Sequence, residues 1–157
     1  MKNQFNMAKK LLTLLFFLGS FLLHSQNLVW NTDLSDAFIM SDAQKKPLLI
    51  FFTAANAGQK IQNEVFSTPD FAVWSRDNVV LLKLDLSDAS LTDADKQKNV
   101  MMKNALGVEE LPQVCLVMIT IRKNKPTINK LGVLGYKVGG AKKWIADSSA
   151  ILHPSSE

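Results

Sequence analysis

The sequence predicts a single α/β domain, in which a mixed sheet of four or five strands is flanked by helices on both faces. Three largely apolar runs, at residues 48–52, 79–85 and 114–119, are typical of buried strands. Helical patterns precede and separate the first two runs, and a hairpin partner and a closing helix follow the third. This order describes a β-α-β unit joined to a β-β-α unit, which places helices on both sides of one sheet.

The first helix is expected between Trp30 and Gln44. Thr32 or Asp33 can cap its N-terminus. Pro47 ends it, because proline disfavours helical backbone in the residue before it. Residues at helical spacing form its inner face: Leu34, Ala37, Phe38 and Ser41. The uncharged run 48–52 then fits a strand covered on both faces.

A short linker at residues 53–57 leads from this strand into a helix at residues 58–66, with Ile61 and Val65 facing inward. The sequence Ser67-Thr68-Pro69-Asp70 is typical of a new helix start, because proline is favoured in the first turn. A further turn or two is therefore expected at residues 71–76.

The later elements end in a hairpin and a helix. The expected order is a loop at 86–92, a helix at 93–106 ended by Gly107, the strand at 114–119, a turn at 124–126, a strand at 127–133 and a helix at 141–152. Asn124 and Pro126 are turn residues, and Gly139 and Gly140 break the chain before the last helix. The inner face of that helix is expected to hold Trp144, Ile145, Ser148 and Ile151.

The N-terminus has the pattern of a secretory signal peptide. Lys2, Lys9 and Lys10 precede an apolar run at residues 11–23, and a polar break follows. The run is shorter than the roughly 20 residues that span a bilayer, which favours cleavage over an uncleaved anchor. The predicted organisation is a signal peptide at 1–25, a domain at 26–152 and a polar tail at 153–157. The protein is therefore expected to be exported, periplasmic or secreted.

The charge of the chain argues against a nucleic-acid partner. The chain has 18 basic and 14 acidic residues, and three of the basic residues lie in the predicted signal peptide. The remainder carries 15 basic and 14 acidic residues, which is no basic excess of the kind that nucleic-acid binding requires. After export, the membrane is not an expected partner.

The sequence predicts no metal site and no cofactor. Its two histidines are His24, in the signal peptide, and His153, in the tail, which excludes a histidine-based metal site or a Ser-His-Asp triad in the core. Four aspartates gather near one loop: Asp85, Asp88, Asp93 and Asp95. They lack the central glycine and closing glutamate of a calcium-binding loop, so helix capping explains them better.

Several segments resemble, in their order and spacing, the thioredoxin-like superfamily and its exported disulfide-isomerase-like members. They are residues 46–53, 64–71 and 79–85, Gly107-Val108, Leu111-Pro112, Gly135-Tyr136, Gly139-Gly140 and Trp144-Ile145. The resemblance covers about Trp30 to Leu152. It implies a thioredoxin-like fold.

The resemblance also implies two cysteines, separated by two residues, where this chain has Ala55 and Gly58. In the family, the first thiolate attacks a disulfide and the second thiol resolves the mixed disulfide. Alanine and glycine can do neither. Dithiol exchange at this degenerate redox site is therefore not expected, and no catalytic residue is predicted.

Cys115 is the only cysteine of the chain, so no internal disulfide can form. It lies inside an apolar strand, which favours a small buried core residue. The alternative is a lone reactive thiol that forms a mixed disulfide or a dimer.

Pro112 matches the position of the family's cis-proline, although the sequence leaves its isomer open. The resemblance implies that this proline exposes neighbouring backbone, which can pair with an extended peptide without any thiol. The candidate peptide-binding residues are Asn56, Ala57, Leu111, Pro112 and Gln113.

The predicted function is therefore that of a non-catalytic protein- or peptide-binding, chaperone-like accessory factor of the cell envelope. Its partner is a protein or peptide. One alternative is an oxidoreductase-related protein that acts through Cys115 alone. The other is a structural subunit of an envelope complex.

Overall fold

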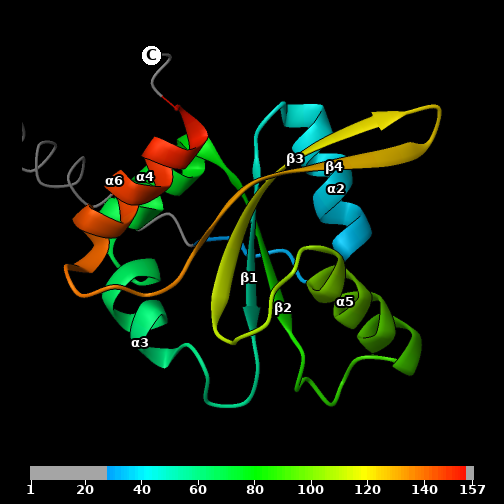
Figure 1. Ribbon diagram of the computed structural model, residues 1–157, viewed down its shortest axis with the longest axis horizontal. Coiled ribbons are helices and arrows are strands. Elements are labelled where there is room, and N and C mark those ends of the chain that lie inside the picture. The colour runs from blue at the N-terminus through cyan, green and yellow to red at the C-terminus, as the bar shows by residue number, and fades with distance from the viewer. Residues whose placement is uncertain (1–27, 155–157) are drawn as a thin grey trace, which may run out of the picture.

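The computed structural model describes residues 28–154 (Figure 1). The predicted signal peptide lies outside the described residues, as do the last three residues of the predicted tail, so both stay predictions. Among the helices of residues 28–154, none is long and apolar enough to cross a membrane.

A mixed sheet forms the centre of the domain. Its strands are β1 (Leu48–Thr53), β2 (Val80–Asp85), β3 (Gln113–Arg122) and β4 (Lys125–Leu134), in the spatial order β2-β1-β3-β4. β1 is parallel to β2, whereas β3 is antiparallel to both β1 and β4. The predicted α/β class with a mixed sheet is confirmed. In the described chain, a fifth strand is reduced to a single bridge between Asn31 and Leu82 at the outer edge of β2.

Helices cover both faces of the sheet. Side chains of α2 (Leu34–Gln44) and α5 (Asp93–Ala105) pack on one face. The other face is covered by α3 (Gln59–Ile61), the π-helical segment η1 (Gln62–Phe66), α4 (Pro69–Asn78) and α6 (Gly140–Leu152) (Figure 1).

Side chains with oxygen acceptors set the starts of three helices. Asp33 caps α2 by accepting the Asp36 N–H at 2.8 Å. Thr68 caps α4, and Thr92 caps α5. Each cap satisfies an N–H group that has no partner within its helix. The helix expected at residues 58–66 differs from its prediction, because only residues 59–61 are α-helical and a π-helical segment follows at residues 62–66.

The sheet divides the core into two parts, one on each face, and β1 is buried along its whole length. Leu48, Ile50 and Phe52 pack beneath α2 and α5, whereas Leu49 and Phe51 pack beneath the helices of the other face. On that second face, aromatic rings contact one another: Trp30, Phe51, Phe66, Phe71, Trp74 and Trp144. Each buried ring stabilises the domain by about 1.5–3 kcal/mol. This packing holds α3 and η1 in place beside the end of β1.

Candidate functional site

A compact turn connects β1 to α3 at the positions where the sequence resemblance implies a pair of cysteines. The Ala57 N–H donates to the Ala54 carbonyl at 2.8 Å. The Thr53 hydroxyl, itself buried, donates to the Ala57 carbonyl at 2.6 Å. Asn56 has φ +60°, a left-handed conformation that asparagine tolerates better than most residues. The turn is therefore closed by its own backbone and by the last residue of β1.

Gly58 joins this turn to Pro112, from a distant part of the sequence. A Cβ built on Gly58 would lie 2.6 Å from Phe51 Cζ and 3.2 Å from Pro112 Cβ. Gly58 also has φ +87°, which side-chain-bearing residues rarely adopt. Position 58 is thus closed to a side chain by backbone conformation and by its neighbours.

The segment before β3 is the other half of the candidate site. The Leu111–Pro112 peptide bond is cis. Leu111, Pro112 and Gln113 are half-buried. The ladder between β1 and β3 begins at the pair Phe52 and Gln113, so Leu111 lies just beyond it. Among residues 28–154, no backbone hydrogen bond engages Leu111.

The predicted peptide-binding residues lie on two neighbouring segments. Contact between them is made by Gly58 and Pro112. Ala55 and Asn56 are exposed, and Ala57 is half-buried. This arrangement leaves a surface of small side chains beside unpaired backbone, with no nucleophile in it.

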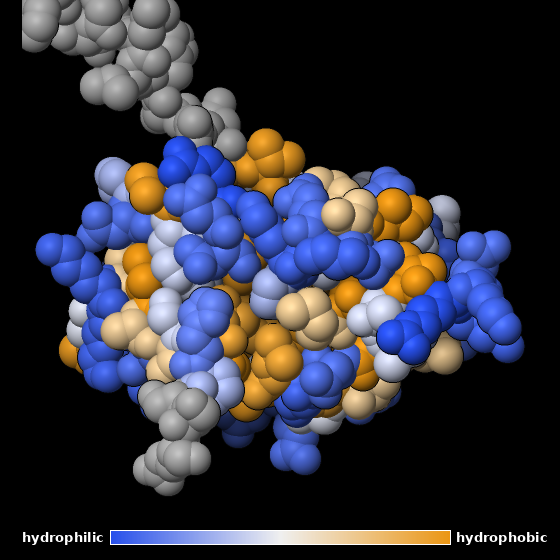
Figure 2. All heavy atoms as spheres, turned by 90° about the horizontal axis from the view of Figure 1, so that it is seen from above, coloured by the Kyte–Doolittle hydropathy of each residue, from blue (hydrophilic) through white to orange (hydrophobic). Residues whose placement is uncertain are grey.

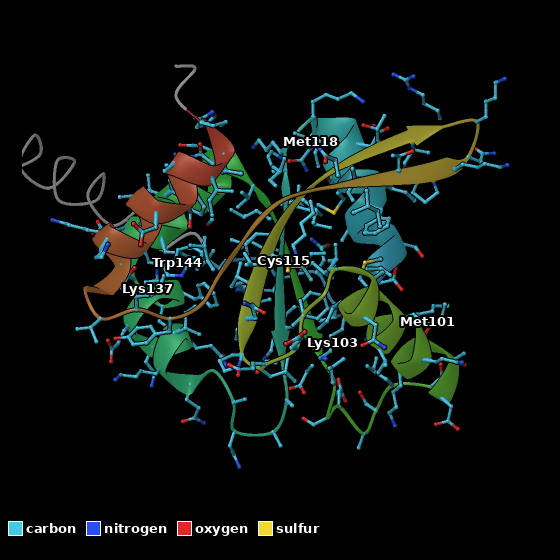
Figure 3. All side chains as sticks on the ribbon, viewed as in Figure 1. Met101, Lys103, Cys115, Met118, Lys137 and Trp144 are labelled. Atoms are coloured by element: carbon cyan, nitrogen blue, oxygen red, sulfur yellow. The ribbon has the colours of Figure 1, made fainter. Side chains whose placement is uncertain are left out.

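Cys115 belongs to a different environment. It is fully buried, and it pairs with Ile50 in the part of the core beneath α2 and α5. Phe51 and Val114, which pair next to it, face the opposite side of the sheet, where Gly58 lies. Figure 3 shows Cys115 within the sheet. Burial raises the pKa of its thiol, although Lys130 acts in the opposite direction.

A cluster of three side chains beside the turn could not be recognised from the sequence. This cluster connects α3 and η1 to the loop before α6. The Tyr136 hydroxyl donates to the Glu64 carboxylate, and Lys60 Nζ lies 5.1 Å from the centre of the Tyr136 ring. The Glu64 carboxylate raises the pKa of Tyr136 because it accepts a hydrogen bond from the neutral phenol and repels a phenolate. The resemblance placed Gly135-Tyr136 at the final turn of the fold, but nothing in the sequence pairs Tyr136 with Glu64.

No group of three or more potential metal ligands gathers within residues 28–154. The aspartates that invited a calcium interpretation act locally. Asp85 and Asp88 accept from the next serines, Ser87 and Ser90, and Asp95 pairs with the Thr92 cap. Two cavities have volumes of about 210 and 280 Å³, and neither is lined by the turn or by the Leu111–Gln113 segment.

Comparison with known proteins shows the fold. No family model and no curated protein matches the chain. A solved structure described as a DsbH oxidoreductase is 20% identical over 80% of this chain and 85% of that chain, with a TM-score of 0.67. A thioredoxin from Thermus thermophilus is 12% identical over 81% of this chain and 88% of that chain, with a TM-score of 0.60. The chain has a thioredoxin-like fold. The thioredoxin-like fold predicted from the sequence is therefore confirmed.

Within this thioredoxin-like domain, the closed turn at Ala54–Gly58 defines what the site can do. It contains no cysteine, and a side chain at Gly58 would meet Phe51 and Pro112. It does offer backbone at Leu111 that can accept a hydrogen-bonded partner.

Proposed function

We propose that this protein is a non-catalytic member of the thioredoxin-like group that binds extended polypeptide segments beside Pro112. The partner's backbone pairs with Leu111, and its side chains lie over the turn at Ala55–Ala57. Such recognition relies on main-chain hydrogen bonds and needs no thiol. The affinity is modest, because the contact area is small and the partner loses conformational freedom on binding.

The observation that carries this proposal is the contact of Gly58 with Pro112 and Phe51. It closes the position of the second thiol while it keeps the turn and the Leu111–Pro112 segment side by side. In this proposal the site has no redox function, and the backbone of Leu111, which is unpaired in the described chain, is free to bind a partner.

The proposal includes export to the cell envelope, as a chaperone-like accessory factor. Its support is the basic start and apolar run of residues 1–25, which resemble a secretory signal. Fusion of residues 1–30 to a reporter enzyme that is active only outside the cytoplasm tests this part separately.

Binding is tested with a reduced and carboxymethylated protein, which stays unfolded and has no free thiol. We expect saturable binding that is weakened at least about tenfold by Ala55→Trp, because the bulky ring would cover the surface. Ala146→Trp is the matched control, since Ala146 is exposed on α6. Equal affinities of the two variants would show that the turn is not part of the binding surface.

The alternative of catalysis through Cys115 has less support. Its thiol is fully buried and faces away from Gly58 and Pro112. A disulfide substrate bound at the turn would not reach the sulfur without a rearrangement of the sheet.

A further inference from the structure

The β3–β4 hairpin extends beyond the rest of the sheet and is covered on one face only (Figure 1). Ile119, Ile121 and Ile128 pack into the core part that contains α2. Because side chains alternate along a strand, the neighbouring residues lie on the opposite face. These are Thr120 and Arg122 on β3, and Lys125, Thr127 and Asn129 on β4. In Figure 1, no helix lies in front of this end of the hairpin.

The outer edge of β4 has unpaired backbone groups, because β3 is its only neighbour in the sheet of the described chain. Lys123 and Asn124 form a two-residue turn with φ of 49° and 61°, which makes Arg122 and Lys125 a hydrogen-bonded pair. Along β4, the backbone N–H and C=O groups of successive residues therefore point alternately towards β3 and away from it. The residues whose groups point away from β3 are Pro126, which has only a carbonyl, Ile128 and Lys130.

Positive charge gathers at the tip of this hairpin. Arg122, Lys123 and Lys125 form the tip, and all three are exposed. None of these three is in an ion pair within residues 28–154. Figure 2 shows a hydrophilic projection at its right, where the hairpin of Figure 1 extends.

These charges indicate which occupant the edge accepts. A second copy of the chain would bring like charges together across the new strand pair, which is unfavourable. An acidic extended segment would complement them. We propose that the outer edge of β4 binds an extended polypeptide in which acidic residues alternate with apolar ones. The acidic side chains lie on the uncovered face beside Lys125, and the apolar ones lie beside half-buried Ile128.

The test uses a blocked heptapeptide of alternating Glu and Val, titrated into the ¹⁵N-labelled protein. Amide hydrogen exchange should slow at Ile128 and Lys130, whose N–H groups point outward. Exchange at Thr127 and Asn129 should not change, because their N–H groups already bond to β3. Replacement of Arg122, Lys123 and Lys125 together by Gln should raise the Kd about fivefold, since each exposed pair contributes little. The matched control replaces Lys96, Lys98 and Lys103 of α5 by Gln, which removes the same charge and should leave the Kd unchanged.

Several results would overturn this proposal. Equal binding of a heptapeptide with Gln in place of Glu would remove the charge requirement. Slower amide hydrogen exchange at Leu111 instead of Ile128 would show that the heptapeptide binds beside Pro112 and not at the edge of β4. Tighter binding of anionic phospholipid vesicles or of a single-stranded oligonucleotide would assign the surface to another class of partner. Ala55→Trp should leave heptapeptide binding unchanged. Failure of the proposed β4 site can therefore be distinguished from failure of the proposed binding beside Pro112.

Discussion

Gly58 lies against Pro112, and a Cβ built on the glycine would stand 3.2 Å from Pro112 Cβ. The same Cβ would lie 2.6 Å from Phe51 Cζ, which is closer than real Cβ contacts. A side chain at position 58 is therefore strained by the backbone conformation and requires Phe51 to shift. The environment of position 58, and not only the identity of its residue, is unfavourable to a cysteine.

Introducing cysteines at positions 55 and 58 should destabilise the domain and should not produce disulfide exchange. The double variant Ala55→Cys, Gly58→Cys should lower the free energy of unfolding by about 2 kcal/mol or more. The left-handed backbone at Gly58 alone costs a side chain about 1–2 kcal/mol, and the contact with Phe51 adds to this. Urea unfolding and insulin reduction with dithiothreitol measure the two effects.

Three single variants separate the causes of this destabilisation. Ala55→Cys should change the free energy of unfolding by less than about 0.5 kcal/mol, because Ala55 is exposed. Gly107→Ala has a similar left-handed φ but only an ordinary contact, to Lys130 Nζ at 3.9 Å. It should cost less than Gly58→Ala. A double-cysteine variant that is fully stable and catalytically active would contradict this account of the turn.

Thr53→Val should loosen the turn. The buried Thr53 hydroxyl donates to the Ala57 carbonyl at 2.6 Å, and valine keeps the shape but cannot donate. The free energy of unfolding should fall by about 1 kcal/mol. Thr127→Val, at an exposed position of β4, should change it by less than about 0.5 kcal/mol. Equal effects of the two changes, in urea unfolding, would mean that the Thr53 bond does not hold the turn.

Tyr136 is the only tyrosine of the chain, so phenolate absorbance reports it alone. Its pKa should lie above the ordinary value of about 10, because the Glu64 carboxylate favours the neutral phenol. A pKa that is higher in the folded state means that the contact stabilises the fold below pH 10. This stabilisation is lost as the pH rises through the native pKa.

Glu64→Gln removes the charge and should return the pKa of Tyr136 towards its ordinary value. Spectrophotometric titration of the two proteins measures the difference. Identical titration curves would show that the contact between Tyr136 and Glu64 is not formed in solution.

Cys115 should react with an alkylating reagent only when the domain unfolds. Its side chain is fully buried, and its pKa is raised by burial, so little thiolate is present at neutral pH. The labelling rate should follow the rate or population of unfolding as urea is added. Rapid labelling of the native protein would support the alternative of a reactive thiol. Cys115→Ala should leave binding of unfolded polypeptide unchanged.

The elements that could be predicted from the sequence were those with local signals. The uncharged run at residues 48–52 predicted β1, and proline after threonine at Thr68-Pro69 predicted a new helix start. The π-helical segment could not be predicted, because it depends on how Val65 and Phe66 pack among aromatic rings from distant segments. Strand β4 begins at Lys125, earlier than predicted, because an edge strand tolerates Pro126.

At the candidate site, the sequence resemblance identified Ala55 and Gly58 as the positions that correspond to the two cysteines. It did not predict which residues surround them. The contact between Gly58 and Pro112 joins residues that are far apart in the chain, and only the folded structure shows it. The pairing of Tyr136 with Glu64 is of the same kind. Sequence patterns identify what a residue is able to do, but such contacts depend on how distant segments pack in the folded chain.

Amide hydrogen exchange at Leu111 tests the central claim most directly. The N–H of Leu111 should exchange rapidly in the free protein, because no backbone partner engages it within the described residues. Exchange should slow at least about tenfold when a carboxymethylated unfolded protein saturates the site. Unchanged exchange at Leu111 under saturation, with protection elsewhere, would contradict peptide recognition beside Pro112.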